Sequence, residues 1–431
     1  MAFIRINGPT PLSGQVVAGG AKNAALPILA ASLLARGTCH LSSVPRLEDV
    51  ATMCQVIEGL GARLAGMERG IKVTVDDVND RVPPEELVRK MRASVLVMGP
   101  LLARIGRARI PLPGGCAIGA RPIDLHLKGF HAMGAQVSLA DGEVEARAAR
   151  LHGASIYLDY PSVGATENLM MAAVLAEGET VIEDAAKEPE IVDLATFLLS
   201  LGADVHGAGT PVIRIRGVGE LHGADHTVIP DRIEAGTYLL AACGTQGDVS
   251  VHNVVPEHMK AVVAKLREMG AEVQVGERSV HLVMPGRVRP TDLKTFPYPG
   301  FPTDLQAPMM AVLTLAAGSS VVTETVFENR FMHASELMRL GARIRMDGRV
   351  AIIEGTDHLW GASVRATDLR AGAGLVVAGL MAHGVTDVCD AHHLDRGYDD
   401  LAGKLRKLGA HVVRVEDDDY FAERWERIHL R

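Results

Sequence analysis

A short motif recurs six times along the chain and limits the folds that the chain can adopt. Leucine or methionine followed by Gly-Ala begins at Leu60, Met133, Leu201, Met269, Leu340 and Leu408, at intervals of 68 to 73 residues. Each copy follows a stretch with helical periodicity, such as AVVAKLREMG, and precedes an alternating stretch, such as AEVQVGERSVHLVM. This pattern is typical of a helix that is stopped by glycine and followed by a β-hairpin. The sequence therefore predicts six copies of one α/β unit.

The other half of each copy contains a second helix that is almost free of charge. In chain order, these segments are AALPILAASLLARGTCHLS, ASVLVMGPLLARIGRARIPL, ENLMMAAVLAEGETVIED, EAGTYLLAACGTQGDVSVHN, LQAPMMAVLTLAAGSSVVTE and AGAGLVVAGLMAHGVTDVCD. Helices of this composition are expected in the interior. Because 431 residues exceed one ordinary core, we expect two domains with three copies each rather than a solenoid.

Polar and often charged residues stand directly before each apolar helix. The segments are GGAKN with Lys22, KMRAS with Arg92, VGATEN with Thr166, PDRIEAG with Arg232, FPTDLQ with Asp304, and TDLRAG with Asp368 and Arg370. Helix N-termini attract anions through their free N–H groups and their dipole. N-capping accounts for Thr166, Thr303 and Thr367. It does not account for the cations, so the pattern favours an anion site over capping alone.

Composition excludes several classes of protein. The 44 basic and 52 acidic residues give a net charge of -8, so a general affinity for duplex nucleic acid is not expected and an anionic ligand must meet local positive charge. Hydrophobic residues make up 48% of the chain and aromatic residues 4%, which is typical of an aliphatic-packed α/β or α+β protein. The start, MAFIRINGPT, lacks the apolar segment of a signal peptide, and the apolar run 26–35 is too short to span a membrane. We expect that run to be a core helix and the protein to be cytoplasmic.

The cysteines and histidines predict neither a disulfide framework nor a metal site. The five cysteines are odd in number and widely spaced: Cys39, Cys54, Cys116, Cys243 and Cys389. No H-E-x-x-H motif occurs, and the adjacent His392 and His393 could not both face one metal from a regular strand. GGAKN also lacks the Walker spacing of a nucleotide-hydrolysis loop. We therefore expect no metal and no cofactor.

Two residues stand out as candidates for chemistry. Cys116 lies in LPGGCAIGARPIDLH, in a glycine-rich loop after an expected strand at RIPL. A thiol there could donate a proton, or Arg121 could favour the nucleophilic thiolate, or Cys116 could be an inert buried residue. Asp304 lies between the proline-rich FPYPGFPT and a helix start, as either a cap or a general base. The histidines at 126, 131, 258 and 333 are expected on helix surfaces or as caps.

Ten motifs together carry a resemblance to a known family. They are GGAKNAALP, MRAS, LPGGCAIGARPIDLH, SVGAT, EPEIVDLATFL, IPDRIEAGT, FPTDLQAP, ETVFENRFMH, TDLRAGA and HHLDRGYDDL. In this order, almost from end to end, they resemble the enolpyruvyl transferases that act on UDP-N-acetylglucosamine (UDP-GlcNAc). The resemblance implies a two-domain inside-out α/β barrel of six repeats, three per domain. It also implies that residues 1–20 join 230–431 in one domain and that 21–229, with the Cys116 loop, form the other.

The reaction that the resemblance implies is the one that begins bacterial peptidoglycan synthesis. The enolpyruvyl group of phosphoenolpyruvate moves to the 3'-hydroxyl of UDP-GlcNAc and phosphate leaves. Protonation of C3 makes C2 electrophilic, the hydroxyl attacks C2, and elimination of phosphate restores the double bond. The expected partners are these two small molecules only, with no nucleic acid, membrane or metal.

The resemblance also assigns roles to residues of this chain. It implies that Cys116 donates the proton to C3 and forms a covalent phospholactoyl adduct, and that Asp304 is the base. Lys22, Arg121 and Arg396 resemble the clamp for phosphate and carboxylate, for which cationic side chains are suited. The further substrate contacts that it implies are Asn23, Arg92, Pro122, Ile123, Asp124, Leu125, Ser162, Val163, Gly164, Val326, Arg330, Asp368 and Arg370.

The sequence departs from the family pattern in two places and leaves two alternative functions open. Some members of the family have a lysine before SVGAT, where this chain has Tyr160 and Pro161, and the acidic tail VEDDDYFAERWERIHLR suggests a solvated end that covers the last hairpin. One alternative is the sister enzyme that acts on shikimate 3-phosphate, which lacks a cysteine in this loop. The other is a non-catalytic relative that binds the nucleotide sugar, against which the retained acid and base argue.

Overall fold

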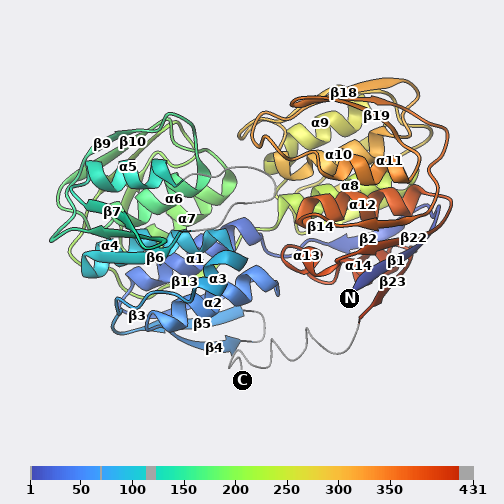
Figure 1. Cartoon of the computed structure of the whole chain (residues 1–431). Helices are drawn as coiled ribbons and strands as arrows, with labels where there is room; N and C mark the ends of the chain where they lie inside the picture. Colours follow the sequence, from blue (N-terminus) through green and yellow to red (C-terminus); the bar gives the residue numbers. More distant parts are fainter. Residues whose placement is uncertain (1, 68–69, 113–122, 417–431) are drawn as a thin grey trace. The chain divides into compact units, whose positions relative to one another are not determined.

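The computed structural model describes residues 2–67, 70–112 and 123–416, which form two compact units. Residues 2–19 and 230–416 belong to one, here called the terminal unit. Residues 20–67, 70–112 and 123–229 belong to the other, the middle unit. Cys116, Arg121, Pro122 and the acidic tail from residue 417 lie outside the described residues. Each unit is a mixture of helices and sheets, as expected (Figure 1).

Three sheets belong to the middle unit. The first has the order β13 (Asp225–Thr227), β3 (Gly37–Ser42), β5 (Gly70–Val75), β4 (Arg63–Met67). The second has the order β6 (Arg107–Pro111), β8 (Glu143–Arg147), β7 (Gln136–Ala140). The third has the order β11 (Asp204–His206), β12 (Val212–Arg216), β10 (Glu179–Glu183), β9 (Ser155–Tyr157). The strand expected at RIPL is confirmed as part of β6.

Three further sheets belong to the terminal unit. The first has the order β21 (Ser363–Arg365), β22 (Gly384–Cys389), β1 (Phe3–Gly8), β23 (His411–Val415). The second has the order β15 (Glu272–Val275), β16 (Ser279–Val283), β14 (Asp248–His252), β2 (Ser13–Val17). The third has the order β17 (Leu293–Lys294), β18 (Ser319–Thr323), β20 (Val350–Glu354), β19 (Arg343–Asp347).

Five of these sheets share one pattern of strand directions. In each, one edge strand runs parallel to its neighbour, and the other pairs are antiparallel. The hairpins expected after the first five Gly-Ala motifs are confirmed as β4–β5, β7–β8, β11–β12, β15–β16 and β19–β20. The second strand of the sixth expected hairpin would lie beyond residue 416, outside the described residues, so this expectation is not tested. After the last motif, β23 pairs with β1 from the start of the chain, in the register Phe3 opposite Val415. Ile4 and Ile6 of β1 are buried and alternate with less buried residues, as expected for a strand with one face toward the core.

The helices of the middle unit include two that are almost fully buried, α1 (Lys22–Ala31) and α6 (Val163–Ala173), and α4 (Met98–Ile105), whose first five residues are buried. The remaining ones are α2 (Glu48–Gly59), α3 (Glu85–Lys90), α5 (Asp124–Ala132) and α7 (Pro189–Ser200), with 3-10 turns η1 (Ser32–Leu34) and η2 (Arg92–Val97). The apolar run 26–35 is confirmed as core, since it lies in α1, η1 and the buried Ala35.

The terminal unit is built around α8 (Arg232–Gly244), α10 (Gln306–Leu313) and α12 (Leu369–Met381), which pack against one another. Figure 1 shows the three helices side by side. The remaining helices are α9 (Lys260–Glu268), α11 (His333–Arg339), α13 (His392–Asp395) and α14 (Leu401–Lys407), with 3-10 turns η3 (Pro256–Met259) and η4 (Thr303–Leu305). All residues of α10 and α12 are buried, so the prediction that the charge-free helices lie inside is confirmed.

Small residues allow these helices to approach closely. A Cβ atom on Gly374 of α12 would lie 2.8 Å from the backbone of Ala307 in α10. In the middle unit, a Cβ atom on Gly99 of α4 would lie 2.3 Å from the carbonyl oxygen of Asn168 in α6. Neither backbone has room for a side chain, which explains why glycine stands at these contacts. Within the described residues, no helix combines the length and the apolar character needed to cross a membrane.

Candidate active site

The predicted site residues that the structure describes fall into two groups, one in each unit. Lys22, Asn23, Arg92 and the segments 123–125 and 162–164 lie in the middle unit. Asp304, Val326, Arg330, Asp368, Arg370 and Arg396 lie in the terminal unit. Cys116, Arg121 and Pro122 lie outside the described residues.

Lys22, the first residue of α1, is held by a carboxylate that the sequence did not reveal. Its Nζ lies 2.6 Å from Oδ2 of Asp49, in the first turn of α2. The two side chains are only 11% and 5% exposed. An ammonium group has three donors and can in general contact a phosphate or carboxylate together with a counter-ion. Arg92 begins η2, which packs against α1.

The expected nucleotide-sugar segments form the starts of two helices. Ile123 is the N-cap residue of α5, and Asp124 and Leu125 follow it. Ser162 caps α6, where its hydroxyl accepts a hydrogen bond from the amide of Ala165 at 3.3 Å, and Val163 and Gly164 form the first turn. Helices α5 and α6 pack against each other. These free N-terminal N–H groups suit a phosphate ligand.

His126 connects these two helix starts, and the expectation of a surface position for it is wrong. It is 6% exposed. Asn168 fixes the ring: its Oδ1 accepts from the Gly99 amide at 2.7 Å, so its Nδ2 donates to the Val95 carbonyl at 2.9 Å and to Nδ1 of His126 at 3.0 Å. The proton of the neutral ring is thereby assigned to Nε2, on the side of Gly164. Burial, with the charge of Arg92, lowers the pKa of His126 to about 4.

Three carboxylates lie together behind the start of α6. Glu167, Glu188 and Glu190 are 3%, 9% and 3% exposed. Glu167 lies in α6, Glu188 is the N-cap residue of α7, and Glu190 lies in the first turn of α7. Burial raises the pKa of Glu167 well above its ordinary value, and the charges of Glu190 and Glu188 raise it further. Glu167 therefore keeps its proton to a higher pH than an exposed glutamate does.

In the terminal unit, Asp304 is held between two arginines. Its Oδ1 accepts from Nη2 of Arg330 at 2.8 Å, and its Oδ2 accepts from Nη2 of Arg370 at 3.1 Å. The arginine side chains are 5% and 4% exposed, while Asp304 is 20% exposed. Burial alone would lower the pKa of Arg370, but the charges of Asp304, Tyr398 and Asp231 raise it above its usual value. The carboxylate is therefore fixed in position and still reached by solvent.

Helix capping sets the position of Arg370. The Asp368 carboxylate caps α12 and accepts from the amides of Arg370 at 2.8 Å and Ala371 at 3.0 Å. The Arg370 guanidinium then lies over the Tyr398 ring, 5.5 Å from its centroid. Arg396, at the end of α13, is half-buried.

Capping by threonine, expected from the sequence, is wrong. Thr166 lies inside α6 and accepts from the Ala186 amide at 3.1 Å, and Thr303 donates to Glu324 at 2.9 Å. The hydroxyl of Thr367 has no hydrogen-bond partner. Aspartate and serine take the capping positions instead, at Ser162, Asp231, Asp368 and Asp400.

Two further histidine expectations need correction. His333 is 1% exposed at the start of α11, and burial, opposed by Asp368 and reinforced by Arg330, lowers its pKa to about 4. His392 and His393 lie in the short helix α13, with ring centroids 4.2 Å apart, and not in a strand. His131, in contrast, is exposed in the last turn of α5, as expected.

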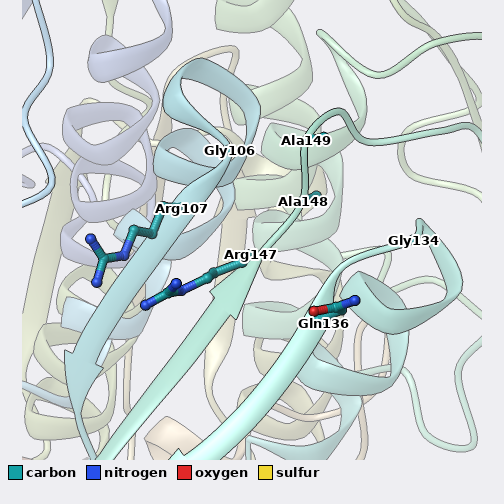
Figure 2. Close-up of a pocket in the computed structure, with 7 residues that line it drawn as sticks. All are labelled: Gly106, Arg107, Gly134, Gln136, Arg147, Ala148 and Ala149. Atoms are coloured by element: carbon teal, nitrogen blue, oxygen red, sulfur yellow. The ribbon is translucent and has the colours of Figure 1, made fainter.

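Other features of the described residues point away from chemistry. A cavity of about 390 Å³ is lined in part by Arg107 and Arg147, which extend from the paired strands β6 and β8 (Figure 2). Both arginines donate to Glu145 at 2.8 Å, and none of the described site residues lines this cavity. Burial raises the pKa of Cys54 and Cys243 to about 12, which leaves both as thiols. No cluster of metal-ligating side chains occurs in the part of the chain that is described.

Comparison with known proteins gives the family. The sequence profile of EPSP synthase (3-phosphoshikimate 1-carboxyvinyltransferase) matches residues 6–405. The chain is 60% identical to UDP-N-acetylglucosamine 1-carboxyvinyltransferase 2 of Carboxydothermus hydrogenoformans, over 96% of this chain and 99% of that protein. It is 55% identical to UDP-N-acetylglucosamine 1-carboxyvinyltransferase of Finegoldia magna, over 97% of this chain and 100% of that protein. The chain belongs to the enolpyruvyl transferase family.

Solved structures of the enolpyruvyl transferase family share the fold. The enolpyruvyl transferase NikO from Streptomyces tendae matches with a TM-score of 0.86 and 29% identity, over 96% of this chain and 99% of that one. An EPSP synthase from Acinetobacter baumannii matches with a TM-score of 0.74 at 18% identity, over 96% of this chain and 100% of that one. The expected mixed α/β fold and the expected family are therefore confirmed, and the chain is a transferase.

Sequence reasoning missed the residues that hold these groups. Asp49, Asn168 and Glu324 are buried partners of Lys22, His126 and Thr303. Asp49 gives only the signal of an acidic residue in the first turn of a helix, which is common. Their pairing depends on contacts between segments distant in sequence, which motif spacing does not encode.

The pair of Lys22 and Asp49 gives a stability prediction. Asp49→Asn leaves a buried ammonium group without its counter-charge, so we expect the free energy of unfolding to fall by about 3 kcal/mol. Urea denaturation measures this change. Asp76→Asn is the control, because Asp76 pairs with Arg63 at 2.7 Å with both side chains more than 60% exposed, and we expect a loss below about 1 kcal/mol. Equal losses in the two variants would contradict a special role for the buried pair.

Glu167 gives a prediction on pH dependence. Because its pKa is raised in the folded protein, it supports folding fully below its unfolded pKa, and this contribution is lost as the pH rises through the folded value. Glu167→Gln cannot lose a proton. We expect the variant to gain stability relative to the parent between pH 5 and pH 8 in urea denaturation.

Glu177→Gln, at an exposed carboxylate of the same unit, serves as the matched control for Glu167. It should follow the parent at both pH values. A parallel pH dependence of Glu167→Gln and the parent would show that Glu167 is ionised throughout.

Proposed function

We propose that this chain transfers the enolpyruvyl group of phosphoenolpyruvate to the 3'-hydroxyl of UDP-GlcNAc and releases phosphate. The observation that carries the proposal is 53–60% identity, over 94–98% of this chain, to relatives named UDP-N-acetylglucosamine 1-carboxyvinyltransferase. On this proposal the reaction is the first committed step of peptidoglycan synthesis, serves cell-wall formation and takes place in the cytoplasm.

The chemistry requires a clamp for phosphate and carboxylate. We assign it to Lys22, Arg121 and Arg396, with Asn23 next to the reacting centre. The support for Lys22 is its position at the start of the buried helix α1 and its ion pair with the buried Asp49, which fixes the ammonium group in place. A fixed ammonium group beside helix N–H groups favours a phosphate dianion over a neutral ligand.

The nucleotide sugar requires donors for its diphosphate. We assign these contacts to Arg92, to residues 121–125 and to Ser162, Val163 and Gly164, and the contacts to the sugar to Val326 and Arg330. The starts of α5 and α6 support the assignment, because both present N-terminal N–H groups. The neutral His126, with its proton on Nε2 beside Gly164, adds one donor of the same kind.

The sugar hydroxyl requires a base, which we assign to Asp304. Arg330 and Arg370 hold one oxygen each. The Asp304 side chain is 20% exposed, so the carboxylate can be reached by a substrate hydroxyl. The arginines fix the direction of the carboxylate before substrate arrives, and such preorganisation is a large source of catalysis. Asp368 and Arg370 complete this side of the proposed site.

We infer the finer architecture on the same basis. The proposal is an inside-out barrel of six repeats, with three repeats in a domain of 1–20 plus 230–431 and three in a domain of 21–229. The presence of three sheets in each unit, five with one strand pattern, supports it.

The test is phosphate release from phosphoenolpyruvate in the presence of each acceptor. We expect release with UDP-GlcNAc and none with shikimate 3-phosphate. Release with shikimate 3-phosphate alone would replace the proposed acceptor. Binding of UDP-GlcNAc without release would identify a non-catalytic sugar-binding relative instead.

The role of Cys116 has its own test. A carboxylic acid can also donate a proton, so we expect Cys116→Asp to retain turnover but to escape alkylation by a phosphonate epoxide of the fosfomycin type. Mass spectrometry of the epoxide-treated proteins detects the adduct. Cys116→Ala should give neither an adduct nor normal turnover. Complete inactivation of Cys116→Asp by the epoxide would remove Cys116 from this role.

A further inference from the structure

Glu324 is a fully buried carboxylate directly after β18, and it accepts hydrogen bonds from four neutral donors. Its Oε1 accepts from the hydroxyl of Thr295 at 2.8 Å and from the amides of Val326 at 2.8 Å and Phe327 at 3.2 Å. Its Oε2 accepts from the hydroxyl of Thr303 at 2.9 Å. A buried carboxylate is costly to keep unless such bonds are made, so its presence calls for an explanation.

The two oxygens of Glu324 face two different parts of the proposed sugar site. Oε1 shapes the turn at Val326 and Phe327, which leads to Arg330. Oε2 holds Thr303, the neighbour of Asp304 in η4. Arg330 links Thr303 to Asp304, because its Nη1 donates to Thr303 at 3.0 Å and its Nη2 donates to Asp304 at 2.8 Å.

The direction of these bonds gives Thr303 a defined role. Its hydroxyl has one proton, which it donates to Glu324, and it accepts from Arg330. A donor that is itself hydrogen-bonded to a carboxylate is a better acceptor for a cation. Arg330 is thereby held at the distance from which it orients Asp304.

We propose that Glu324 is a positioning residue for the transfer reaction, which sets the orientation of Asp304 through Thr303 and Arg330. The inference rests on the proposed function, since it assumes that Asp304 takes the proton of the sugar hydroxyl. Glu324 itself contacts neither the reacting atoms nor the substrate in this account.

Glu324→Gln tests the proposal without a change of shape. The amide oxygen of Gln must face the three donors at Oε1, so its NH2 group faces Thr303 and donates where the carboxylate accepted. The turn at Val326 is kept, but the proton of Thr303 loses its acceptor. We expect kcat to fall by about 10-fold to 100-fold, with KM for phosphoenolpyruvate unchanged.

Thr303 supplies the matched variants. Thr303→Val should reproduce the loss in kcat, Thr303→Ser should restore near-parental kcat, and Glu324→Gln combined with Thr303→Val should be no worse than either alone. Glu354→Gln, at an exposed carboxylate of the neighbouring strand β20, should leave both constants unchanged. If Glu324→Gln does not fold, the comparison of Thr303→Val with Thr303→Ser tests the proposal.

Two results would overturn the inference. One is a Glu324→Gln or Thr303→Val variant whose kcat stays within twofold of the parent, even if its melting temperature falls. The other is a double variant in which the two losses multiply. Failure of the parent to release phosphate would instead refute the proposed function. In that case, the affinity of the same variants for UDP-GlcNAc, measured by calorimetry, would show whether the Glu324 network orders the contacts to the sugar.

Discussion

Mutual burial of helices that are almost free of charge is the constraint on which both units depend. Helices α10 and α12 are buried at every residue, and glycine at 374 allows their backbones to touch. Such helices can present polar groups only at their ends. The charged residues Lys22, Asp304 and Arg370 accordingly stand at or next to helix starts, where backbone N–H groups are available. The same packing that stabilises the core therefore creates the places where chemistry is possible.

Other side chains hold these charged residues, and the neighbouring Thr303, in position. Asp49 holds Lys22, Arg330 and Arg370 hold Asp304, and Glu324 holds Thr303. A charge taken out of water is tolerated only when it is paired or hydrogen-bonded. Burial therefore fixes each group in one orientation, and that orientation depends on the few side chains that bind it. Groups held in this way before substrate arrives form a preorganised site.

The fold was predictable where the signal is local. Helix periodicity, glycine stops and alternating hairpins gave the repeated unit, and the ten motifs gave the family. Pairing across the chain was not predictable. The partner of β23 is β1, some four hundred residues away in sequence. His126 and His333 looked like surface residues because isolated histidines carry no burial signal, and Asp49 and Glu324 looked like ordinary acidic residues. Their roles follow from tertiary contacts that no spacing encodes.

Proton NMR of a reaction run in D2O with phosphoenolpyruvate and UDP-GlcNAc tests the central claim most directly. If C3 is protonated before the hydroxyl attacks and loses a proton again on elimination of phosphate, the product is a new vinyl ether of UDP-GlcNAc that contains deuterium at C3. Absence of a vinyl ether, or a vinyl ether without deuterium, would contradict the account.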